Sequence, residues 1–309
     1  MNANPIRCLN GSSPLVRSGK VPIDVITLPS GRALTVHRLD RCYPAGCGNK
    51  GPKLIERLHE YVRRGDRGVV TVGGAFSNHV HALAALGHQM GVPTAAIIRG
   101  TDADFDNPTL ADARRWGMRL ITVDRATYAS RDSEPFRQWA AAQCPGFALV
   151  PEGGNDASSE AACAALAGQL AVPAHADLVI AAGTGATARG LARGFGSRVS
   201  VVAADVVGSD ADGLVGSSPA AVRCVDARLN GYGRVTPAFL AWLSDTWEQT
   251  GVLFDPLYNG KAAYWIETAQ CEGAHLLHTG GLQGWRGIAG RGQLAAYPLL
   301  QAAVSALRF

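Results

Sequence analysis

The sequence predicts an α/β fold with open, mostly parallel sheets and helices on both faces. Short runs rich in Val and Ile alternate with helical patterns along the chain. Each run is apolar throughout, as expected of parallel strands that are covered on both faces. Strands that alternate with helices in this way are typical of α/β proteins. The expected strands lie within 67–74, 93–100, 119–123, 147–154, 177–183 and 198–205, with helices at 77–91 and 107–117.

The region 206–235 follows the last of these strands and is irregular and rich in glycine. We expect it to form a long loop or a loosely ordered excursion. Arg63 and Arg64, a short basic pair, are expected at the end of a helix.

Composition points to a globular protein of enzyme size. The chain has 309 residues, of which 47% are hydrophobic and 17% charged. This length is enough for one large domain or two smaller ones. The net charge is +4, and the Lys and Arg residues are dispersed along the chain. This pattern argues against nucleic acid or an anionic membrane surface as a partner, and leaves room for a small anionic ligand.

Cysteine usage and hydropathy indicate a reducing, cytoplasmic setting. The N-terminal stretch lacks the apolar core of a secretory signal, and no window approaches the length of a membrane span. Seven cysteines occur at irregular spacings without a CxxC pair, which fits neither a disulfide framework nor a zinc site. His79 and His81 lie two residues apart, so on a helix they face different sides and no metal site is expected.

Two strand-to-helix corners have the features of anion sites. The first is "VGGAFSNHV", where a strand ends at Gly73-Gly74 and Ser77 and Asn78 are suited to cap the next helix. Free amides in the first turn of a helix can bind a carboxylate or phosphate. The alternative is ordinary capping, which any helix needs.

The second corner is "AAGTGATARG", where a strand runs directly into Gly183-Thr184-Gly185-Ala186-Thr187. Glycines allow close approach of the backbone to an anion, and threonine hydroxyls add donors. The motif is neither GxGxxG nor a P-loop, and it suits a single phosphate better than a pyrophosphate. Gly-rich turns are common, so this corner alone is weak evidence.

A lysine in "GCGNKGPKL" combines with these corners to suggest a chemistry. Lys50 lies behind Gly48 and Asn49, and Pro52 suits the first turn of a helix. A lysine amine can form a Schiff base with pyridoxal phosphate (PLP), whose phosphate needs one anion site. An amino-acid substrate brings a carboxylate that needs the other. The alternative is an ordinary surface lysine.

The chain resembles the fold-type II, tryptophan-synthase-β-like PLP enzymes. More narrowly, it is similar to the 1-aminocyclopropane-1-carboxylate (ACC) deaminase and D-cysteine desulfhydrase branch. The resemblance runs from about Arg38 almost to the C-terminus. It rests on the motifs "GNKxxKL", "GGxxSNH", "GTGAT", "DPxYxGK" and "HTGG" in this order.

The resemblance implies PLP as cofactor and a role for each matching residue. Lys50 matches the Schiff-base lysine, and Lys53 a second lysine that helps to hold the phosphate. Gly183, Thr184, Gly185, Ala186 and Thr187 match the phosphate loop, and Asn78, Asn259 and Thr279 are expected beside the cofactor.

The resemblance also implies how a small amino-acid substrate is bound. Ser77, Asn78 and His79 match the segment that binds the substrate carboxylate. Tyr232 and Tyr258 match two active-site tyrosines, and one or the other is expected to handle a proton near the β-carbon or the leaving group. Lys50, Ser77, Tyr232 and Tyr258 are therefore the expected catalytic residues.

Departures from the family pattern favour one branch. Deaminases of this family carry a glutamate where this chain has Asn259, and a leucine where it has Thr279 in "HTGG". Desulfhydrases resemble this chain better, also in having a histidine at position 79. A carboxylate keeps the pyridine nitrogen protonated, whereas an amide does so far less. The protonated ring is a strong electron sink. Opening a cyclopropane needs a stronger sink than eliminating a thiolate, because the thiolate is a good leaving group. The prediction is a β-eliminating lyase that yields an α-keto acid and ammonia.

Other functions stay open at this point. They are ACC deamination, a biosynthetic reaction such as β-replacement with the pocket reshaped around Cys47, Gly51 and Pro52, PLP binding without turnover, and a Rossmann oxidoreductase. The resemblance implies a small domain at 51–155 inserted into a large PLP-binding domain of 1–50 and 156–309. It also implies a homodimer.

Overall fold

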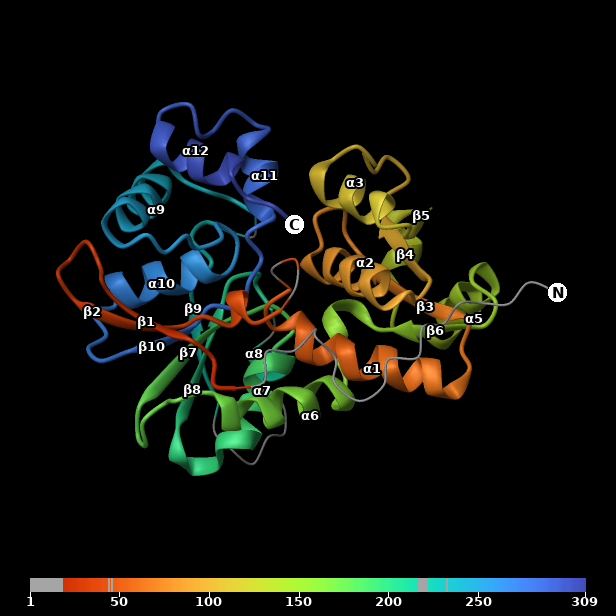
Figure 1. The fold of residues 1–309 in the computed structure, drawn as a ribbon, viewed down its shortest axis with the longest axis horizontal. Helices are drawn as coiled ribbons and strands as arrows, with labels where there is room; N and C mark the ends of the chain where they lie inside the picture. The colour runs from red at the N-terminus through yellow and green to blue at the C-terminus, as the bar shows by residue number, and fades with distance from the viewer. Residues whose placement is uncertain (1–18, 44, 46, 210, 216–221, 232) are drawn as a thin grey trace. The chain divides into compact units, whose positions relative to one another are not determined.

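A computed structural model describes residues 19–309 except 44, 46, 210, 216–221 and 232. The described residues divide into two compact units (Figure 1). The smaller comprises Leu54–Glu152, and the larger comprises Gly19–Lys53 and Gly153–Phe309. The division into domains at 51 and 155 stays a prediction, because a compact unit is not by itself an independent folding domain.

The larger unit is built on a six-stranded sheet in the order β1-β2-β10-β7-β8-β9. Only the β1–β2 hairpin is antiparallel, and every other neighbouring pair is parallel. The apolar central strands β7 and β8 are buried almost throughout. The strands are β1 (Ile23–Thr27), β2 (Ala33–His37), β7 (Asp177–Ala182), β8 (Ser200–Asp205), β9 (Val222–Asp226) and β10 (His275–Leu277).

Helices lie on both faces of this sheet, with α9 and α10 on one side and α6 and α7 on the other (Figure 1). The main core lies on the α9–α10 side, where Phe239, Phe254 and Trp285 are buried with Val179 and Val202 of the sheet. The helices are α6 (Ala157–Leu166), α7 (Ala186–Phe195), α8 (Ala211–Val215), α9 (Pro237–Thr250), α10 (Asn259–Thr268), α11 (Gly284–Ala289) and α12 (Pro298–Ser305).

The smaller unit holds a four-stranded parallel sheet in the order β5-β4-β3-β6. Phe136 and Ala140 of α5 pack with Val70, Val72 and Ile97 on one face of the sheet. The strands are β3 (Gly68–Gly73), β4 (Thr94–Arg99), β5 (Arg119–Val123) and β6 (Phe147–Val150). The helices are α1 (Lys50–Arg64, from Leu54 onward in this unit), α2 (Asn78–Met90), α3 (Pro108–Arg115), α4 (Arg125–Ala129) and α5 (Glu134–Gln143).

The predicted α/β class and all six predicted strands are confirmed, and α1 ends at Arg64 as expected. The prediction of one long loop over 206–235 is wrong. This region contains α8 and the edge strand β9, which pairs with β8 from Val201 to Asp205. The sequence of β9, "VRCVD", has only two β-branched residues and little apolar character, so pairing with β8 rather than its own pattern defines it.

Helices α6 and α7 approach closely because α7 carries glycines on the contact face. A Cβ on Gly190 would lie 2.5 Å from the Glu160 carbonyl oxygen and 2.6 Å from the Cys163 Cβ. A Cβ on Gly194 would lie 2.3 Å from the Ala164 carbonyl oxygen. The backbones therefore pack directly against each other, which brings the side chains at the edge of this contact within hydrogen-bonding reach.

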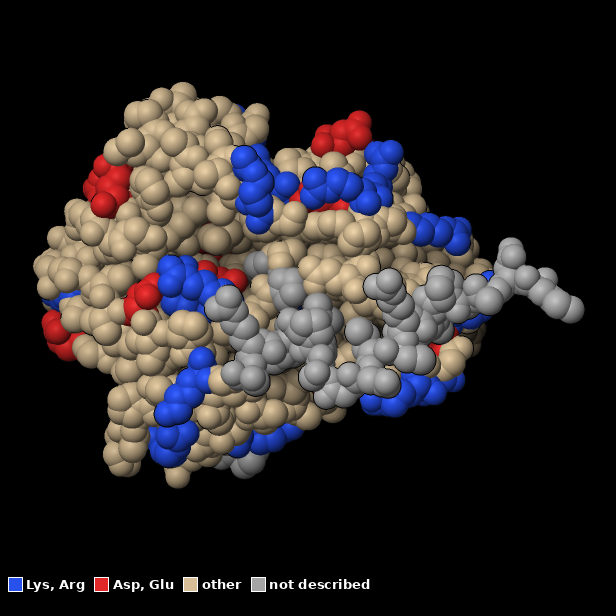
Figure 2. All heavy atoms as spheres, in the orientation of Figure 1, with Lys and Arg blue, Asp and Glu red and all other residues tan. Residues whose placement is uncertain are grey.

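Charged side chains are dispersed over the face of the molecule that is drawn in Figure 2. On the face drawn in Figure 2, Lys and Arg lie in several separate groups, some with acidic side chains beside them. Among the residues that the structure describes, no helix has the length and apolar character needed to cross a membrane.

The close packing of α6 and α7 gives a testable prediction. Gly190→Ala should lower the free energy of unfolding by about 1–3 kcal/mol, because the added methyl group meets backbone that cannot move aside easily. Chemical denaturation of the purified protein measures the change. Gly168→Ala is the matched control, since a Cβ at this nearby glycine meets nothing within 4 Å. Equal stability of the two variants would contradict the packing argument.

Candidate active site

Polar segments follow the carboxyl ends of four parallel strands of the larger unit. The strands β2, β10, β7 and β8 are neighbours in this order and run in the same direction. Their carboxyl ends therefore meet at one sheet edge, where ligands bind in open α/β folds. The segments that leave this edge are, in the same order, Arg38–Asp40, His278–Gly280, Gly183–Thr187 and the stretch 206–209.

The turn that carries Lys50 lies directly on the segment after β10. The Asn49 N–H donates to the Thr279 carbonyl oxygen at 3.2 Å. A Cβ on Gly48 would lie only 1.9 Å from the same oxygen, and Gly48 has a φ of +49°. Both the space and the backbone conformation therefore require glycine at this position. The next glycine, Gly51, lies against the Tyr43 ring, with 2.3 Å between its ideal Cβ position and Cγ.

A hydrogen bond joins the Lys50 turn to the segment after β7. The Asn49 side-chain Nδ2 donates to Thr187 Oγ1 at 2.9 Å. The structure thus brings together Lys50 and the GTGAT segment, which lie more than 130 residues apart in the chain. Lys50 is the first residue of α1, and its Nζ lies 3.4 Å from the Gly153 carbonyl oxygen.

Lys50 is held in a setting that favours the neutral amine. Burial lowers the pKa of Lys50 to about 7, and the positive charge of Lys53 contributes. Lys53 is 2% exposed, and burial also lowers its pKa. A neutral amine is the nucleophilic form of lysine. Lys50 is therefore poised to attack a carbonyl group near neutral pH.

The GTGAT segment forms a turn whose amides precede the first helical hydrogen bond of α7. Gly185 is the N-cap of α7 and has a left-handed φ of +78°. The first main-chain bond of the helix runs from the Arg189 N–H to the Gly185 carbonyl oxygen at 3.0 Å. The N–H groups between them have no partner within the helix, as in known anion sites. We call Gly183–Thr187 the cradle.

Asp255 organises the start of α10. Its Oδ1 accepts from the N–H groups of Leu257 and Tyr258 at 3.1 and 2.7 Å, and its Oδ2 accepts from the Asn259 N–H at 2.8 Å. Burial raises the pKa of Asp255, and the Asn259 backbone N–H is the strongest influence opposing it. The aspartate of "DPLYNG" is thus a capping residue that fixes the direction of Tyr258 and Asn259.

The Asn259 side chain is fully buried and saturated with hydrogen bonds. Its Nδ2 donates to Asp255 Oδ2 and to the Gly280 carbonyl oxygen, the latter at 2.8 Å. Its Oδ1 accepts from Thr279 N–H and Oγ1–H at 2.8 and 3.0 Å. The amide nitrogen faces two acceptors and the amide oxygen faces two donors, so only one orientation of the amide satisfies all four bonds. Asn259 thereby ties α10 to the segment after β10, and its contact with a cofactor stays a prediction.

Of the two predicted tyrosines, Tyr258 lies beside the cradle. A Cβ on Gly183 would lie 3.5 Å from Cε1 of the Tyr258 ring. Tyr232 lies outside the described residues. The turn that precedes Tyr232 in the chain is held by Lys261, whose Nζ donates to the carbonyl oxygens of Arg228 and Gly231 at 2.7 and 2.8 Å. The buried lysine of "DPLYNGK" therefore fixes the backbone of the turn at Arg228–Gly231.

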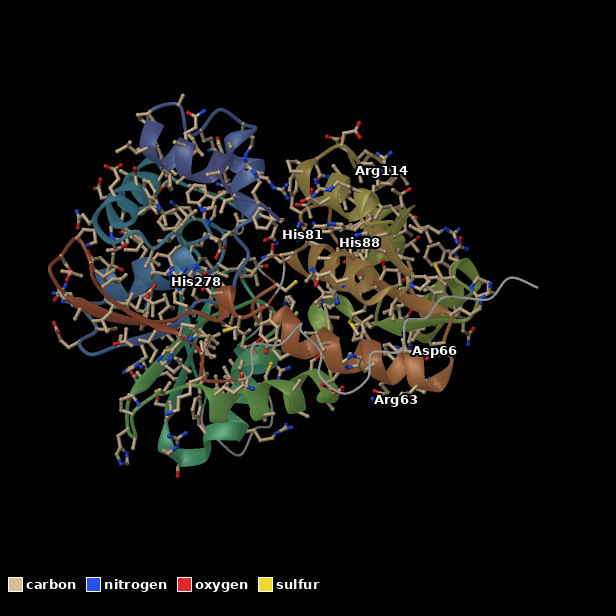
Figure 3. All side chains as sticks on the ribbon, in the orientation of Figure 1. Arg63, Asp66, His81, His88, Arg114 and His278 are labelled. Carbon is tan, nitrogen blue, oxygen red and sulfur yellow. The ribbon has the colours of Figure 1, made fainter. Side chains whose placement is uncertain are left out.

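A buried ionic cluster at the same edge was not predicted from the sequence. Arg38 Nε and Nη2 donate to the two oxygens of Asp40 at 2.9 and 2.6 Å. Asp40 Oδ1 lies 3.6 Å from Nδ1 of His278, which is fully buried within the larger unit (Figure 3). Burial alone would raise the pKa of Asp40, but His278 and Arg38 outweigh it and hold the pKa below its ordinary value.

In the sequence, the only sign of this cluster is polar residues after an apolar run, "LTVHRLD". Because β2 and β10 are parallel neighbours, these residues meet the histidine of "HTGG". The pairing of the two strands is what a single sequence does not reveal.

The smaller unit contains the other predicted anion site. Ser77 is the N-cap of α2, and its Oγ accepts from the Val80 N–H at 3.3 Å. Asn78 is the first residue of the helix, directly after the Gly73–Gly74 corner. A Cβ on Gly73 would lie within 2.9 Å of the Ser77 side chain, so glycine is needed for the corner to close. The predicted cap is confirmed, and carboxylate binding by this corner stays a prediction.

The two histidines that follow have different surroundings. His79 is buried at 2% exposure. His81 lies inside the smaller unit (Figure 3), where its Nε2 is 3.0 Å from Asp112 Oδ2 and its ring meets the edge of Trp116. His81 therefore links α2 to α3.

Comparison with protein families identifies the family of the chain that carries this sheet edge. The model for the family described as pyridoxal-phosphate dependent enzyme matches residues 39–242. This chain belongs to that family. The match excludes the alternative of a Rossmann oxidoreductase, and it confirms the predicted cofactor class.

Relatives of this PLP-dependent enzyme point to one branch of the family. It is 28% identical over 297 residues to an Arabidopsis thaliana protein named bifunctional D-cysteine desulfhydrase/1-aminocyclopropane-1-carboxylate deaminase, mitochondrial. The alignment covers 83% of this chain and 74% of the relative. A crystal structure of an ACC deaminase homologue matches 90% of this chain and 95% of its own, with a TM-score of 0.71 and 20% identity. A crystal structure of O-ureido-L-serine synthase matches 86% of this chain and 90% of its own, with a TM-score of 0.61 and 17% identity.

The residues at the sheet edge of this PLP-dependent enzyme fit the cofactor. Lys50 supplies an amine whose pKa of about 7 leaves a large fraction of it neutral near pH 7. The cradle supplies first-turn amides and the hydroxyls of Thr184 and Thr187, with Lys53 buried in the same unit. A phosphate carries two negative charges at neutral pH, and amides with a nearby cation are the groups that bind it.

The depressed pKa of Lys50 predicts how cofactor attachment depends on pH. The rate of attachment of PLP to the apoprotein should rise as pH increases through about 7, because only the neutral amine attacks. Stopped-flow absorbance measures the rate. Borohydride reduction and peptide mapping should place the label on Lys50, whereas a label on Lys53 or Lys261, or a midpoint near the ordinary value of 10.5, would contradict the prediction.

Proposed function

We propose that this PLP-dependent enzyme is a lyase that removes the β-substituent of a small D-amino acid. D-cysteine is the substrate that we infer first. The proposal is supported by the similarity to a relative whose name includes D-cysteine desulfhydrase. It is carried by the uncharged Asn259 amide, all of whose donors and acceptors are used within the protein.

The balanced reaction consumes one water. D-cysteine loses its α-proton and its thiolate, and the resulting enamine is hydrolysed to pyruvate and ammonia. The thiolate leaves as hydrogen sulfide after it takes up a proton. No oxidant or reductant is needed.

Residues of the larger unit are proposed to hold the cofactor and to move the α-proton. Lys50 is the attachment point, and the cradle with Lys53 holds the phosphate. When bound, PLP withdraws electron density from the α-carbon of the substrate. The Lys50 amine would be the base that removes the α-proton, since its pKa of about 7 matches this task.

Ser77, Asn78 and His79 are proposed to bind the substrate carboxylate. Ser77 caps α2, so the first-turn N–H groups and the side chains of this corner offer donors to an anion. Holding the carboxylate fixes the direction in which the α-hydrogen bond is presented. Tyr258, which lies against Gly183 of the cradle, or Tyr232, is proposed to protonate the leaving group.

We infer elimination rather than opening of a cyclopropane ring because residue 259 is a neutral asparagine and not a carboxylate. Both N–H groups of the Asn259 amide are already donated to Asp255 and Gly280, so the amide is no substitute for a carboxylate against a protonated ring nitrogen. A weak electron sink suffices when the leaving group is a thiolate.

A second candidate function is ACC deamination, which the name of the same Arabidopsis relative also includes. A biosynthetic β-replacement is a third, with Gly51 packed on Tyr43 as the local departure from the family motif. Homodimer formation and a cytoplasmic location stay predictions.

A matched pair of cap variants tests the carboxylate site. Ser77→Ala should reduce kcat/KM by roughly 10²–10³, because it removes an oriented donor, while PLP stays bound. Ser133→Ala is the control. Ser133 caps α5 with the same 3.3 Å bond to the N–H of the third residue of its helix. Each variant should lose about 1 kcal/mol of stability as a cap. Equal turnover by both would show that Ser77 is only a cap.

Substrate preference is tested by a matched assay of keto-acid release. The purified holoenzyme should form pyruvate from D-cysteine at least tenfold faster than it forms α-ketobutyrate from ACC, because position 259 carries no charge. L-cysteine is included to test chirality, and Lys50→Ala should be inactive on all three. Faster ACC turnover would contradict the electronic argument, and inactivity of the parent on every substrate would favour β-replacement.

A further inference from the structure

Arg189 lies behind the cradle and is the most highly connected side chain of that region. It lies one turn into α7 with 11% of its side chain exposed. Its Nε donates to Glu160 Oε1 at 2.7 Å, and its Nη2 donates to Asn155 Oδ1 at 2.8 Å. Its Nη1 donates to the carbonyl oxygens of Thr184 and Gly213 at 3.0 and 2.5 Å. One guanidinium thus joins α6, the segment after β6, the cradle and α8.

The bond to Thr184 fixes the direction of a cradle amide. The Thr184 carbonyl and the Gly185 N–H belong to one peptide plane, and in a trans peptide they point in opposite directions. The described residues contain no cis peptide bond. Since Arg189 holds the carbonyl, the Gly185 N–H is directed away from Arg189.

A second donor acts in the same way on the preceding peptide. Ser209 Oγ–H donates to the Gly183 carbonyl oxygen at 2.6 Å, which directs the Thr184 N–H away from Ser209. Ser209 is itself held by its own N–H, which donates to Asp205 Oδ1 at 3.2 Å. Two successive carbonyls of the cradle are therefore turned toward the protein, and their N–H partners are turned away from it.

The packing around Arg189 leaves its guanidinium little freedom. A Cβ on Gly185 would lie 2.6 Å from Arg189 Nη1 and 2.8 Å from the Leu214 backbone. On the other side, the close contact of α6 and α7 at Gly190 places Glu160 beside Arg189. Glu160 also accepts from Arg193 Nη2 at 3.0 Å, but Arg193 is about half exposed and lies one turn further from the cradle.

We propose that Arg189 is a positioning residue for the cofactor phosphate, because it holds the Thr184–Gly185 peptide with its N–H available to the anion. The proposal rests on the assignment of the cradle as the phosphate site. The guanidinium acts through the backbone and needs no contact with the phosphate. Its fixed fork of donors is what the role requires, and a lysine ammonium at this position has the charge without the fork.

The test compares two ligands that differ only in the phosphate. The dissociation constants of PLP and of pyridoxal are measured by titrating apoprotein and following absorbance and intrinsic fluorescence. In Arg189→Met, the affinity for PLP should fall about tenfold, the size of effect that follows from losing a hydrogen bond that orients a donor to a charged group. The affinity for pyridoxal should stay within about twofold. A general loss of structure would lower both affinities, and this outcome overturns the proposal.

Two control variants complete the test. Arg193→Met removes the other guanidinium on Glu160 and should leave both affinities unchanged. Arg189→Lys retains the charge and should behave like Arg189→Met. Full recovery of PLP affinity by the lysine variant would show that charge alone matters, and this overturns the positioning role.

A further variant separates failure of the inference from failure of the cradle assignment. Thr187→Val removes a cradle hydroxyl and should lower the affinity for PLP relative to pyridoxal. If Thr187→Val changes this ratio and Arg189→Met does not, the inference about Arg189 is wrong and the cradle assignment holds. If neither changes the ratio, the cradle assignment and the inference are both wrong.

Discussion

The hydrogen bond between Asn49 and Thr187 is the constraint on which the arrangement of the larger unit's polar groups depends. It connects the turn that begins α1 to the turn that begins α7. The close approach of Gly48 to Thr279 fixes the same turn from the other side. Lys50 is thus held between the segments that leave β7 and β10. A flexible side chain gains its direction from a backbone that cannot move, which is how a rigid scaffold supports chemistry at a loop.

Around this constraint, three buried polar side chains have defined partners. Asp255 is surrounded by N–H groups, Asn259 has two donors and two acceptors satisfied, and Asp40 is paired with Arg38. Buried polar networks specify one geometry only when every member is satisfied. The motifs "DPLYNG" and "HTGG" therefore appear in the structure as two halves of one network rather than as separate sites.

The sequence predicted local features more reliably than long-range ones. The strands 67–74 and 177–183 and the cap at Ser77 were predictable because apolar runs, glycines and capping residues act within a few residues. Strand β9 and the Arg38–Asp40–His278 cluster were not, because pairing with β8 and β10 defines them. Lys50 and the cradle were identified from separate motifs, but their connection through Asn49 was not. Tyr232 lies outside the described residues, so its predicted role has no structural comparison.

The burial of Lys50 and Lys53 has a consequence for the life of the protein in a cell. Burial lowers the pKa of both amines, and the charge of Lys53 lowers the pKa of Lys50 further, so a protonated lysine there costs folding free energy. On the proposed assignment of the cradle, the phosphate of PLP would be the counter-ion for this region, and a ligand that binds only the folded state raises stability as its concentration rises. The cofactor is in this sense part of the fold. On this assignment, the folded fraction of the enzyme in a cell would rise with the concentration of PLP.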